Sequence, residues 1–216
     1  MTIQFYFAPF STSNITQAVL AELGVTCERI ELSIDAGDTR KPSFLAINPN
    51  GRVPVLVVDG VVLWEAAAIT SYLGETYGVD VGLYPPAGLE RGQAMSWITW
   101  TNTELAQAAG RLSAQLPPDA DGAVQEGSTD VLTTSQRSDD EFNQARRDLE
   151  KHLGVLDAAL TDKDYVLGDF TLADTHLWVI VGWVSALGIG LSGYRNVSAW
   201  SVRIDQRPAM RSAFSR

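Results

Sequence analysis

The chain has 216 residues, 45% of them hydrophobic and 19% charged, which is an ordinary composition for one large or two small folded domains. Its 26 acidic residues outnumber 16 basic ones, and the net charge of −10 argues against binding to nucleic acid or to an anionic membrane surface. The single cysteine excludes an intramolecular disulfide, and the two histidines lack zinc-site spacing, so we expect no metal cofactor.

Residues 1–78 alternate between strand and helix patterns. Hydrophobic periodicity and turn residues predict, in chain order, a strand over 3–7, a helix over 15–23, a strand over 27–32, a short helix over 42–47, strands over 55–58 and 61–64, and a helix over 65–77. The last two strands meet at Asp59-Gly60, a strong hairpin signal. This β-α-β-α-β-β-α order requires a parallel pair joined by a crossover, followed by an antiparallel hairpin.

The pattern changes after residue 78. Residues 79–89 form a linker rich in glycine and proline, and helices are expected over roughly 90–115, 139–160, 172–187 and 197–214. We therefore predict an α/β domain over 1–78 and an all-helical domain over 90–216. The connection over 116–138 is unusually long, and it is either a solvated acidic loop or a functional excursion.

A proline stands at the start of the expected strand 55–58, in the stretch NPNGRVPVLVVDG. Proline lacks an N–H group and normally stays out of strand interiors. If the Val53–Pro54 bond is cis, the N–H and C=O of Val53 point out of the sheet and can pair with an extended backbone. A trans proline at a sheet edge is the alternative on sequence alone.

Four segments resemble the cytosolic glutathione transferases, and together they span both domains. They are FAPFSTSN (7–14), GDTRKPSFLAINPNGRVPVL (37–56), LWEAAAITSYL (63–73) and GDFTLADTHLW (168–178). The resemblance implies a thioredoxin-like domain followed by a helical domain. It also implies that glutathione is the co-substrate and that the Val53–Pro54 bond is cis, with the Val53 backbone holding the cysteinyl part of glutathione.

A transferase uses glutathione as the thiolate, although a free thiol with a pKa of about 8.5 is mostly protonated at neutral pH. A hydroxyl before the first helix, assisted by the helix dipole, would favour the anion. Resemblance to serine-type transferases selects Ser11, whereas comparison with bacterial cysteine-type relatives puts Thr12 in the place of the cysteine. Ser13 is a third hydroxyl. We expect Ser13 or Asn14 to cap the helix, which would leave Ser11 free as the catalytic residue.

The two ends of glutathione need charged partners. Glu65 is expected to hold the γ-glutamyl ammonium, and the N–H groups at Ala66 its carboxylate. The family usually has serine where this chain has Ala66, and a lost hydrogen bond to a charged group costs about 1.5–3 kcal/mol. The glycyl carboxylate is assigned to a cation, for which the candidates are Arg40, Lys41 and Arg52.

The helical domain contributes structural signals and part of the electrophile pocket. Thr171 and Asp174 form a capping box that is expected to start a buried helix, with His176 inside it as a core histidine. Trp97 and Trp100, three residues apart, indicate core packing more than a binding site. Phe10, next to the hydroxyl cluster, is expected to line the apolar electrophile pocket.

These features predict a homodimeric glutathione transferase that conjugates the thiolate of glutathione to apolar electrophiles. The alternatives are a glutathione-dependent peroxidase or disulfide reductase, and a non-catalytic binding or scaffold protein with the same fold. The first ten residues lack the features of a signal peptide, and the lone cysteine suits a reducing compartment, so we expect a cytoplasmic protein.

Overall fold

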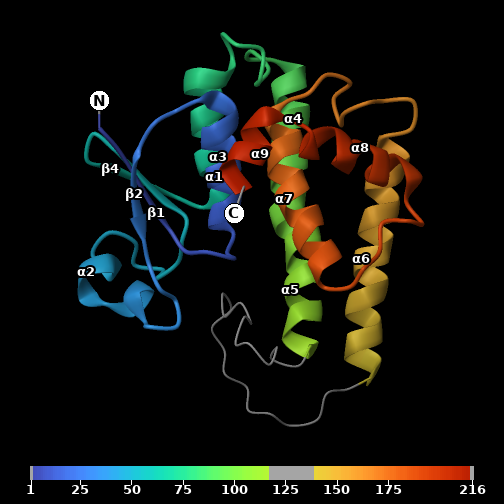
Figure 1. Ribbon diagram of the computed structural model, residues 1–216, viewed down its shortest axis with the longest axis horizontal. Helices are drawn as coiled ribbons and strands as arrows, with labels where there is room; N and C mark the ends of the chain where they lie inside the picture. Colours follow the sequence, from blue (N-terminus) through green and yellow to red (C-terminus); the bar gives the residue numbers. More distant parts are fainter. Residues whose placement is uncertain (1, 117–138, 215–216) are drawn as a thin grey trace.

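The computed structural model describes residues 2–116 and 139–214. Its first half contains a four-stranded sheet and three α-helices, in the predicted order: β1 (Ile3–Phe7), α1 (Ser13–Leu23), β2 (Glu28–Glu31), α2 (Pro42–Leu45), β3 (Val55–Val58), β4 (Val61–Trp64) and α3 (Ala66–Leu73). A short 3₁₀ turn, Asp38–Arg40, precedes α2. In Figure 1 this sheet lies on one side of the molecule and the long helices on the other.

The strand order is β2-β1-β3-β4, with β1 parallel to β2 and antiparallel to β3. The hairpin prediction is confirmed, since β3 and β4 pair antiparallel across Asp59 and Gly60. Both turn residues have positive φ, 46° and 85°, the conformation that a tight two-residue hairpin demands. The β-α-β-α-β-β-α prediction is therefore correct, and the fold is thioredoxin-like.

The second half is helical and contains α4 (Leu89–Trp100), α5 (Ala106–Gln115), α6 (Asp139–Ala159), α7 (Leu172–Ala186), α8 (Arg195–Asp205) and α9 (Pro208–Phe214). A π-helical turn, Thr101–Leu105, joins α4 to α5, and a second one, Gly74–Gly78, extends α3. The prediction of one terminal helix over 197–214 is wrong, because Pro208 has no N–H to continue α8 and begins α9 instead. The long connection predicted over 116–138 lies, beyond Leu116, outside the described residues.

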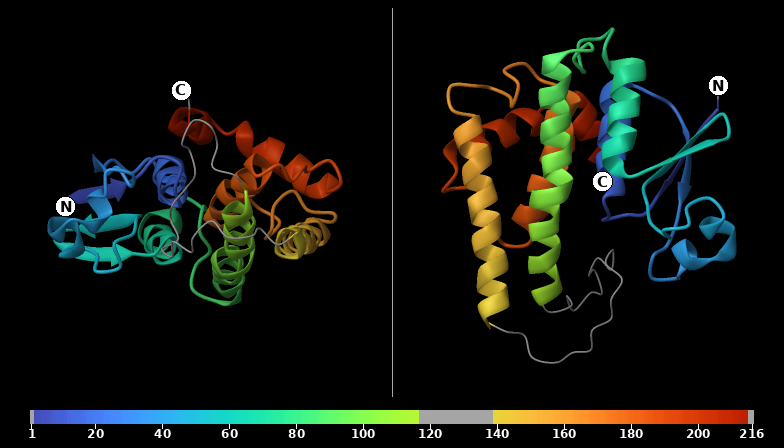
Figure 2. Two further views of the ribbon diagram at one scale, coloured as in Figure 1. Left: turned by 90° about the horizontal axis from the view of Figure 1, so that it is seen from below. Right: turned by 180° about the vertical axis from the view of Figure 1, so that it is seen from behind.

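Helices α1 and α3 separate the sheet from the long helices. They pack against each other, and α1 also contacts α7 and α9. Figure 2 shows this layering from two further sides. Apolar residues of the sheet, such as Phe5 and Leu56, and of the helical half, such as Leu177 and Val181, belong to one continuous buried cluster. Both halves therefore share a core, and α1 and α3 are held from two sides.

The predicted capping box starts α7 and also ties the helical half together. Thr171 is the N-cap, and the Asp174 carboxylate accepts hydrogen bonds from the N–H groups of Thr171 and Val166, at 3.0 Å each. It also accepts one from the indole Nε1–H of Trp200 on α8, at 2.9 Å. Burial raises the pKa of the Asp174 carboxyl, and these donors act in the opposite direction. The role is structural, as the sequence indicated.

Candidate functional site

The candidate residues gather at one end of the sheet. Tyr6, Val55 and Trp64 are aligned across β1, β3 and β4. Because β1 and β4 end at this level and β3 begins there, the segments 8–12, 52–54 and 65–66 all emerge from the same end of the sheet. Helices α1 and α3, which lie side by side, both begin at this end (Figure 2, right). Two helix N-termini therefore face the site, and each presents N–H groups without an intrahelical acceptor.

The loop before α1 is hydrogen-bonded to the segment before β3. The hydroxyl of Thr12 donates to the carbonyl oxygen of Val53 at 3.2 Å, and Thr12 is exposed. The Val53–Pro54 bond is cis, which confirms that expectation. Paired strand residues begin at Val55, so the backbone of Val53 lies outside the ladder and remains half-exposed.

The expectation that Ser13 or Asn14 caps α1 and leaves Ser11 free is wrong. The hydroxyl of Ser11 donates to the carbonyl of Ala8 at 2.7 Å and accepts from the N–H of Ser13 at 3.2 Å. Its Oγ also lies 2.9 Å from the Oγ of Ser13, which is buried. Serine hydroxyls readily bond a backbone N–H two residues on, and this local competition takes up Ser11.

A buried asparagine shapes the turn that presents Arg52 and Val53. The side chain of Asn48 donates to the carbonyl of Arg52 at 2.7 Å and accepts from the N–H of Asn50 at 3.1 Å. Gly51 has φ of 62°, and a Cβ there would lie 3.0 Å from the carbonyl oxygen of Thr39. Only glycine suits that position. The NPNG sequence thus holds its own loop against the segment that contains Arg40.

The three candidate cations differ in their surroundings. The ammonium of Lys41 contacts the carboxylate of Asp38 at 2.6 Å, which lowers the pKa of that carboxyl. Arg40 and Arg52 are exposed and form no ion pair with any described residue. The two arginines, rather than Lys41, therefore keep their charge available for an anion.

Glu65 adopts a backbone conformation that a non-glycine residue rarely accepts. It is the N-cap of α3 with φ of 73°, its side chain makes no capping hydrogen bond, and the residue is exposed. This is not the ordinary first-turn position of an acidic residue. Strained residues of this kind cluster at ligand sites. Ala66 follows, only 3% exposed, so its N–H opens the helix at a point where no hydroxyl is present.

The aromatic candidates, one from the loop before α1 and two from α4, occupy different places. Phe10 has φ of 54° and is 58% exposed next to Ser11. Trp97 and Trp100 contact each other edge to face at 5.4 Å, and Trp100 packs on His152 of α6. Both tryptophans are partly buried against the hydrophobic core, as the spacing indicated.

His176 is a satisfied core histidine, as predicted, and it joins three elements. Its Nδ1 lies 2.9 Å from the Thr70 hydroxyl of α3, and its Nε2 lies 2.8 Å from Oδ1 of Asn102 in the π-helical turn. Since an amide oxygen only accepts, Nε2 carries the proton and Nδ1 accepts from Thr70. Complete burial lowers the pKa of His176 to about 3, so the ring is neutral.

Two side-chain interactions join the first half of the chain to its C-terminal segment and were not predicted from the sequence. The Arg207 guanidinium makes two hydrogen bonds to the Glu22 carboxylate, at 2.6 and 2.8 Å, and lies 3.4 Å from the centre of the Phe170 ring. The side chain of Gln17 on α1 bonds the carbonyl of Ala213 at 2.6 Å. Pairs almost 200 residues apart leave no periodic signal, so no local pattern could have found them.

The described residues contain no group of three or more His, Cys, Asp or Glu side chains that could hold a metal ion. Among the helices in the described ranges, none is both long and apolar enough to cross a membrane.

Two family models match this chain. The glutathione S-transferase N-terminal domain matches residues 1–75, and the glutathione S-transferase C-terminal domain matches residues 120–208. Among curated proteins, the chain is 26% identical to glutathione S-transferase GstA of Escherichia coli O157:H7, over 99% of this chain and 98% of that protein. It is 30% identical to a glutathione S-transferase of Silene vulgaris, over 97% and 95% of the two chains.

Two solved structures resemble this chain over nearly its whole length. A sphingomonad glutathione S-transferase complexed with glutathione is 27% identical, with a TM-score of 0.79 over 97% of this chain and 96% of that one. Ure2p in complex with glutathione has a TM-score of 0.85 over 99% and 98% of the chains, and its 22% identity supports similarity of fold alone.

Proposed function

The chain belongs to the glutathione S-transferase family, and on this premise we propose that it binds glutathione at the sheet end and transfers the thiolate to small apolar electrophiles. The observation that carries the proposal is the contact between Thr12 and Val53. It brings a hydroxyl at the start of α1 beside a backbone that lies outside the sheet ladder. A peptide with a thiol side chain, lying along Val53, would meet both groups.

The cysteinyl backbone of glutathione pairs with the N–H and C=O of Val53 next to Pro54, in the manner of an added strand. Its sulfur then lies at the loop before α1, where Ser11 and Thr12 present their hydroxyls. In the free protein the Thr12 hydroxyl donates a hydrogen bond to the carbonyl of Val53. When the ligand occupies that carbonyl, the hydroxyl turns and donates its hydrogen bond to the sulfur instead. The Ser11 hydroxyl donates to the carbonyl oxygen of Ala8 at 2.7 Å. Thr12 is therefore our first candidate for the thiolate partner, and Ser11 is the second.

The remaining charges of glutathione have partners at the same end. The γ-glutamyl ammonium pairs with Glu65, and its carboxylate lies on the free N–H groups of Ala66 and the next residue, at the positive end of α3. The glycyl carboxylate pairs with Arg40 or Arg52, whose planar forks match a carboxylate. Lys41 is a weaker candidate because Asp38 already holds its ammonium.

The reaction follows from this arrangement. A hydroxyl hydrogen bond and the N-terminus of α1 stabilise the anion, which lowers the thiol pKa toward neutrality. The thiol proton is released to solvent, the sulfur lone pair attacks an electrophilic carbon, an S–C bond forms, and the leaving group departs with the electron pair of the bond that breaks. Phe10, exposed beside Ser11, supplies apolar surface for the electrophile. Conjugation of this kind is the chemistry of detoxification.

The protein's own cysteine is unsuited to this chemistry. Cys27 is half-buried, and burial raises the pKa of its thiol, with Arg29 acting in the opposite direction. A raised pKa leaves little thiolate at neutral pH. The reactive sulfur is therefore that of glutathione, both for conjugation and for the alternative reduction of peroxides or disulfides. An unpaired cysteine also suits the cytoplasm, where we place the protein.

A homodimer is the proposed assembly. Exposed apolar side chains lie on the edge strand β4 and on α4, namely Val61 (64%), Trp64 (44%), Leu89 (92%) and Met95 (45%). Helix α3 lies between these two elements, contacts both, and contains no charged residue. We infer that these side chains belong to one apolar surface, which suits a second copy of the chain.

A glutathione titration followed by ultraviolet difference absorbance tests the proposal, since it registers thiolate formation on binding. We expect a saturable thiolate signal at a pH below the ordinary thiol pKa, and none with S-methylglutathione, which has no ionisable thiol. Saturable binding without thiolate would favour the second candidate, a binding protein of this fold, which the missing hydroxyl at Ala66 supports. Absence of binding would overturn both.

A further inference from the structure

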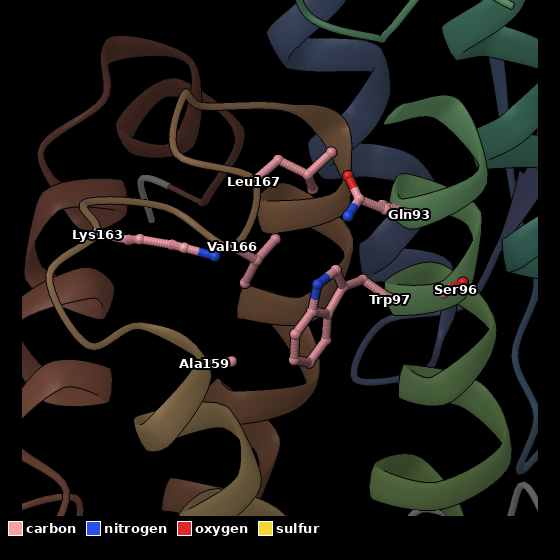
Figure 3. A pocket seen from close by; sticks show the side chains of 7 residues that line it. All are labelled: Gln93, Ser96, Trp97, Ala159, Lys163, Val166 and Leu167. Carbon is pink, nitrogen blue, oxygen red and sulfur yellow. The ribbon is translucent and has the colours of Figure 1, made fainter. Parts of the chain in front are cut away.

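A cavity of about 240 Å³ lies in the helical half, away from the proposed glutathione site. It is bounded by α4, by the end of α6 and by the loop that leads toward α7, and Figure 3 shows its lining. The seven lining residues are Gln93, Ser96, Trp97, Ala159, Lys163, Val166 and Leu167. None of them belongs to the proposed transferase machinery.

The lining combines an apolar wall with hydrogen-bond donors. Trp97, Val166 and Leu167 present rings and aliphatic carbons, and no carboxylate lines the cavity. In Figure 3 the ammonium of Lys163 points toward Val166 and the indole of Trp97. Neither that ammonium nor Nε1–H of Trp97 has a hydrogen-bond partner in the described part of the chain. Both groups only donate, so an acceptor between them would satisfy both.

Among the residues that line the cavity, only Lys163 carries a charge at neutral pH. Lys163 is flanked by Asp162 and Asp164, but the Asp164 carboxylate lies 3.5 Å from the Arg203 guanidinium, which offsets its charge. The hydroxyl of Ser96 donates to the carbonyl of Gly92 at 2.9 Å, so it offers only lone pairs to the cavity. The lining therefore carries one positive charge, that of the Lys163 ammonium.

The loop that carries Lys163 is anchored on both sides. The N–H of Val166 donates to the buried Asp174 carboxylate at 3.0 Å, and Tyr165 pairs with Gly168 as an isolated bridge. Val166 itself is only 4% exposed. Because the loop is held in this way, its side chains need little further ordering when a ligand binds. This preorganisation reduces the entropic cost of binding.

We propose that this cavity is a second binding site, selective for a small aromatic monocarboxylate. The aromatic ring packs between Trp97 and the side chains of Val166 and Leu167, and the carboxylate accepts hydrogen bonds from Lys163 and from Nε1–H of Trp97. The volume is below the roughly 300–1,000 Å³ of sites for drug-sized ligands, so a single ring with a short acidic arm is the matching size. The site is independent of glutathione binding.

Phenylacetate is the probe, and 2-phenylethanol is its neutral counterpart with the same ring. Binding of each to the full chain is measured by calorimetry or by saturation-transfer nuclear magnetic resonance. We expect saturable phenylacetate binding that K163Q weakens at least tenfold, while the affinity for 2-phenylethanol changes less than twofold. K151Q, which removes an exposed lysine of α6 outside the lining, is the matched control and should leave both affinities unchanged. A159F, which fills the cavity, should abolish binding of both probes.

Three results would overturn the proposal: no saturable phenylacetate binding, equal loss in K163Q and K151Q, or displacement of phenylacetate by saturating glutathione. The last result would place the probe in the transferase site. Thermal unfolding of each variant establishes that it is folded, and K163Q replaces an exposed residue, so the test does not depend on A159F.

Discussion

The hydroxyl of Thr12 lies 3.2 Å from the carbonyl oxygen of Val53, so the residue at the N-cap position of α1 reaches the backbone proposed to bind the cysteinyl part of glutathione, and its side chain makes no capping hydrogen bond. Ser11, one residue earlier, points its hydroxyl back to Ala8 instead. Two adjacent hydroxyls therefore have different roles in the free protein, one at the proposed ligand edge and one within its own loop.

Replacing Thr12 by alanine is predicted to raise the pKa of bound glutathione by about one unit, since one hydrogen bond to the thiolate is lost. Turnover near neutral pH should fall about tenfold, and Thr12→Ser should restore it. Ser11→Ala should leave the thiol pKa unchanged and lower the free energy of unfolding by about 1 kcal/mol, as loss of a capping hydroxyl does. Ultraviolet titration of the bound thiol measures both pKa values. A raised thiol pKa in Ser11→Ala alone would return the role to Ser11.

Ala66→Ser is predicted to tighten glutathione binding about ten- to hundredfold. The added hydroxyl can donate to the γ-glutamyl carboxylate, and a hydrogen bond to a charged group contributes about 1.5–3 kcal/mol. Ala68→Ser, on the exposed side of the same helix, is the control and should not change the affinity. Calorimetric titration gives both dissociation constants. Equal affinities in the two variants would argue that the γ-glutamyl end does not lie at the start of α3.

Met95→Glu is predicted to shift the chain toward the monomer, because it puts a charge into the apolar surface of β4, α3 and α4. Val202→Glu is the matched control, since Val202 is similarly exposed, at 51%, but lies on α8 outside that surface. Light scattering after gel filtration reports the mass of each. A dimer that survives Met95→Glu and dissociates in Val202→Glu would move the interface to α8.

Arg207→Met is predicted to destabilise the fold by about 3–5 kcal/mol, since it leaves the carboxylate of Glu22 buried without its partner. That side chain is 3% exposed. Arg207→Lys should cost less, about 1–2 kcal/mol, because an ammonium keeps the charge and loses the fork and the stacking on Phe170. Denaturant unfolding measures both. If Arg207→Met were neutral, the pair would not hold α1 to the turn between α8 and α9.

His176 is predicted to make stability depend on pH between about 3 and 6.5. Its pKa is lowered to about 3 in the folded chain, so below the ordinary value of 6.5 the unfolded chain binds a proton that the folded chain does not. The free energy of unfolding therefore falls as the pH drops, by about 1.4 kcal/mol per unit from this group, and the contribution is constant above 6.5.

The difference in slope between the wild type and His176→Gln measures this effect. Glutamine can still accept a hydrogen bond from Thr70 and donate one to Asn102, but it takes up no proton. The slope of the free energy of unfolding against pH should therefore decrease by about 1.4 kcal/mol per pH unit between pH 3 and 6.5. His152→Gln controls for the second histidine, whose pKa burial also lowers. An unchanged slope in His176→Gln would mean that the ring is protonated in the folded chain.

Features that depend on neighbouring residues could be predicted from the sequence. Asp59-Gly60 specifies a tight hairpin because both positions need positive φ, and the β3–β4 pair followed as predicted. Thr171 and Asp174 are three residues apart, which suffices to define the cap of α7. The order of elements and the residues near the sheet end were equally accessible, since each depends on neighbours along the chain.

Periodicity, turns and caps act over a few residues, so the order of elements, the fold and the family could be predicted from the chain alone. Four findings needed the packed molecule: which hydroxyl reaches Val53, that Asp38 holds Lys41, that Arg207 pairs with Glu22, and that Lys163 lines a cavity with Trp97. Hydroxyl rotation, competition among neighbouring hydrogen-bond partners and contacts between distant segments depend on the packed chain, where distance along the sequence no longer predicts distance in space.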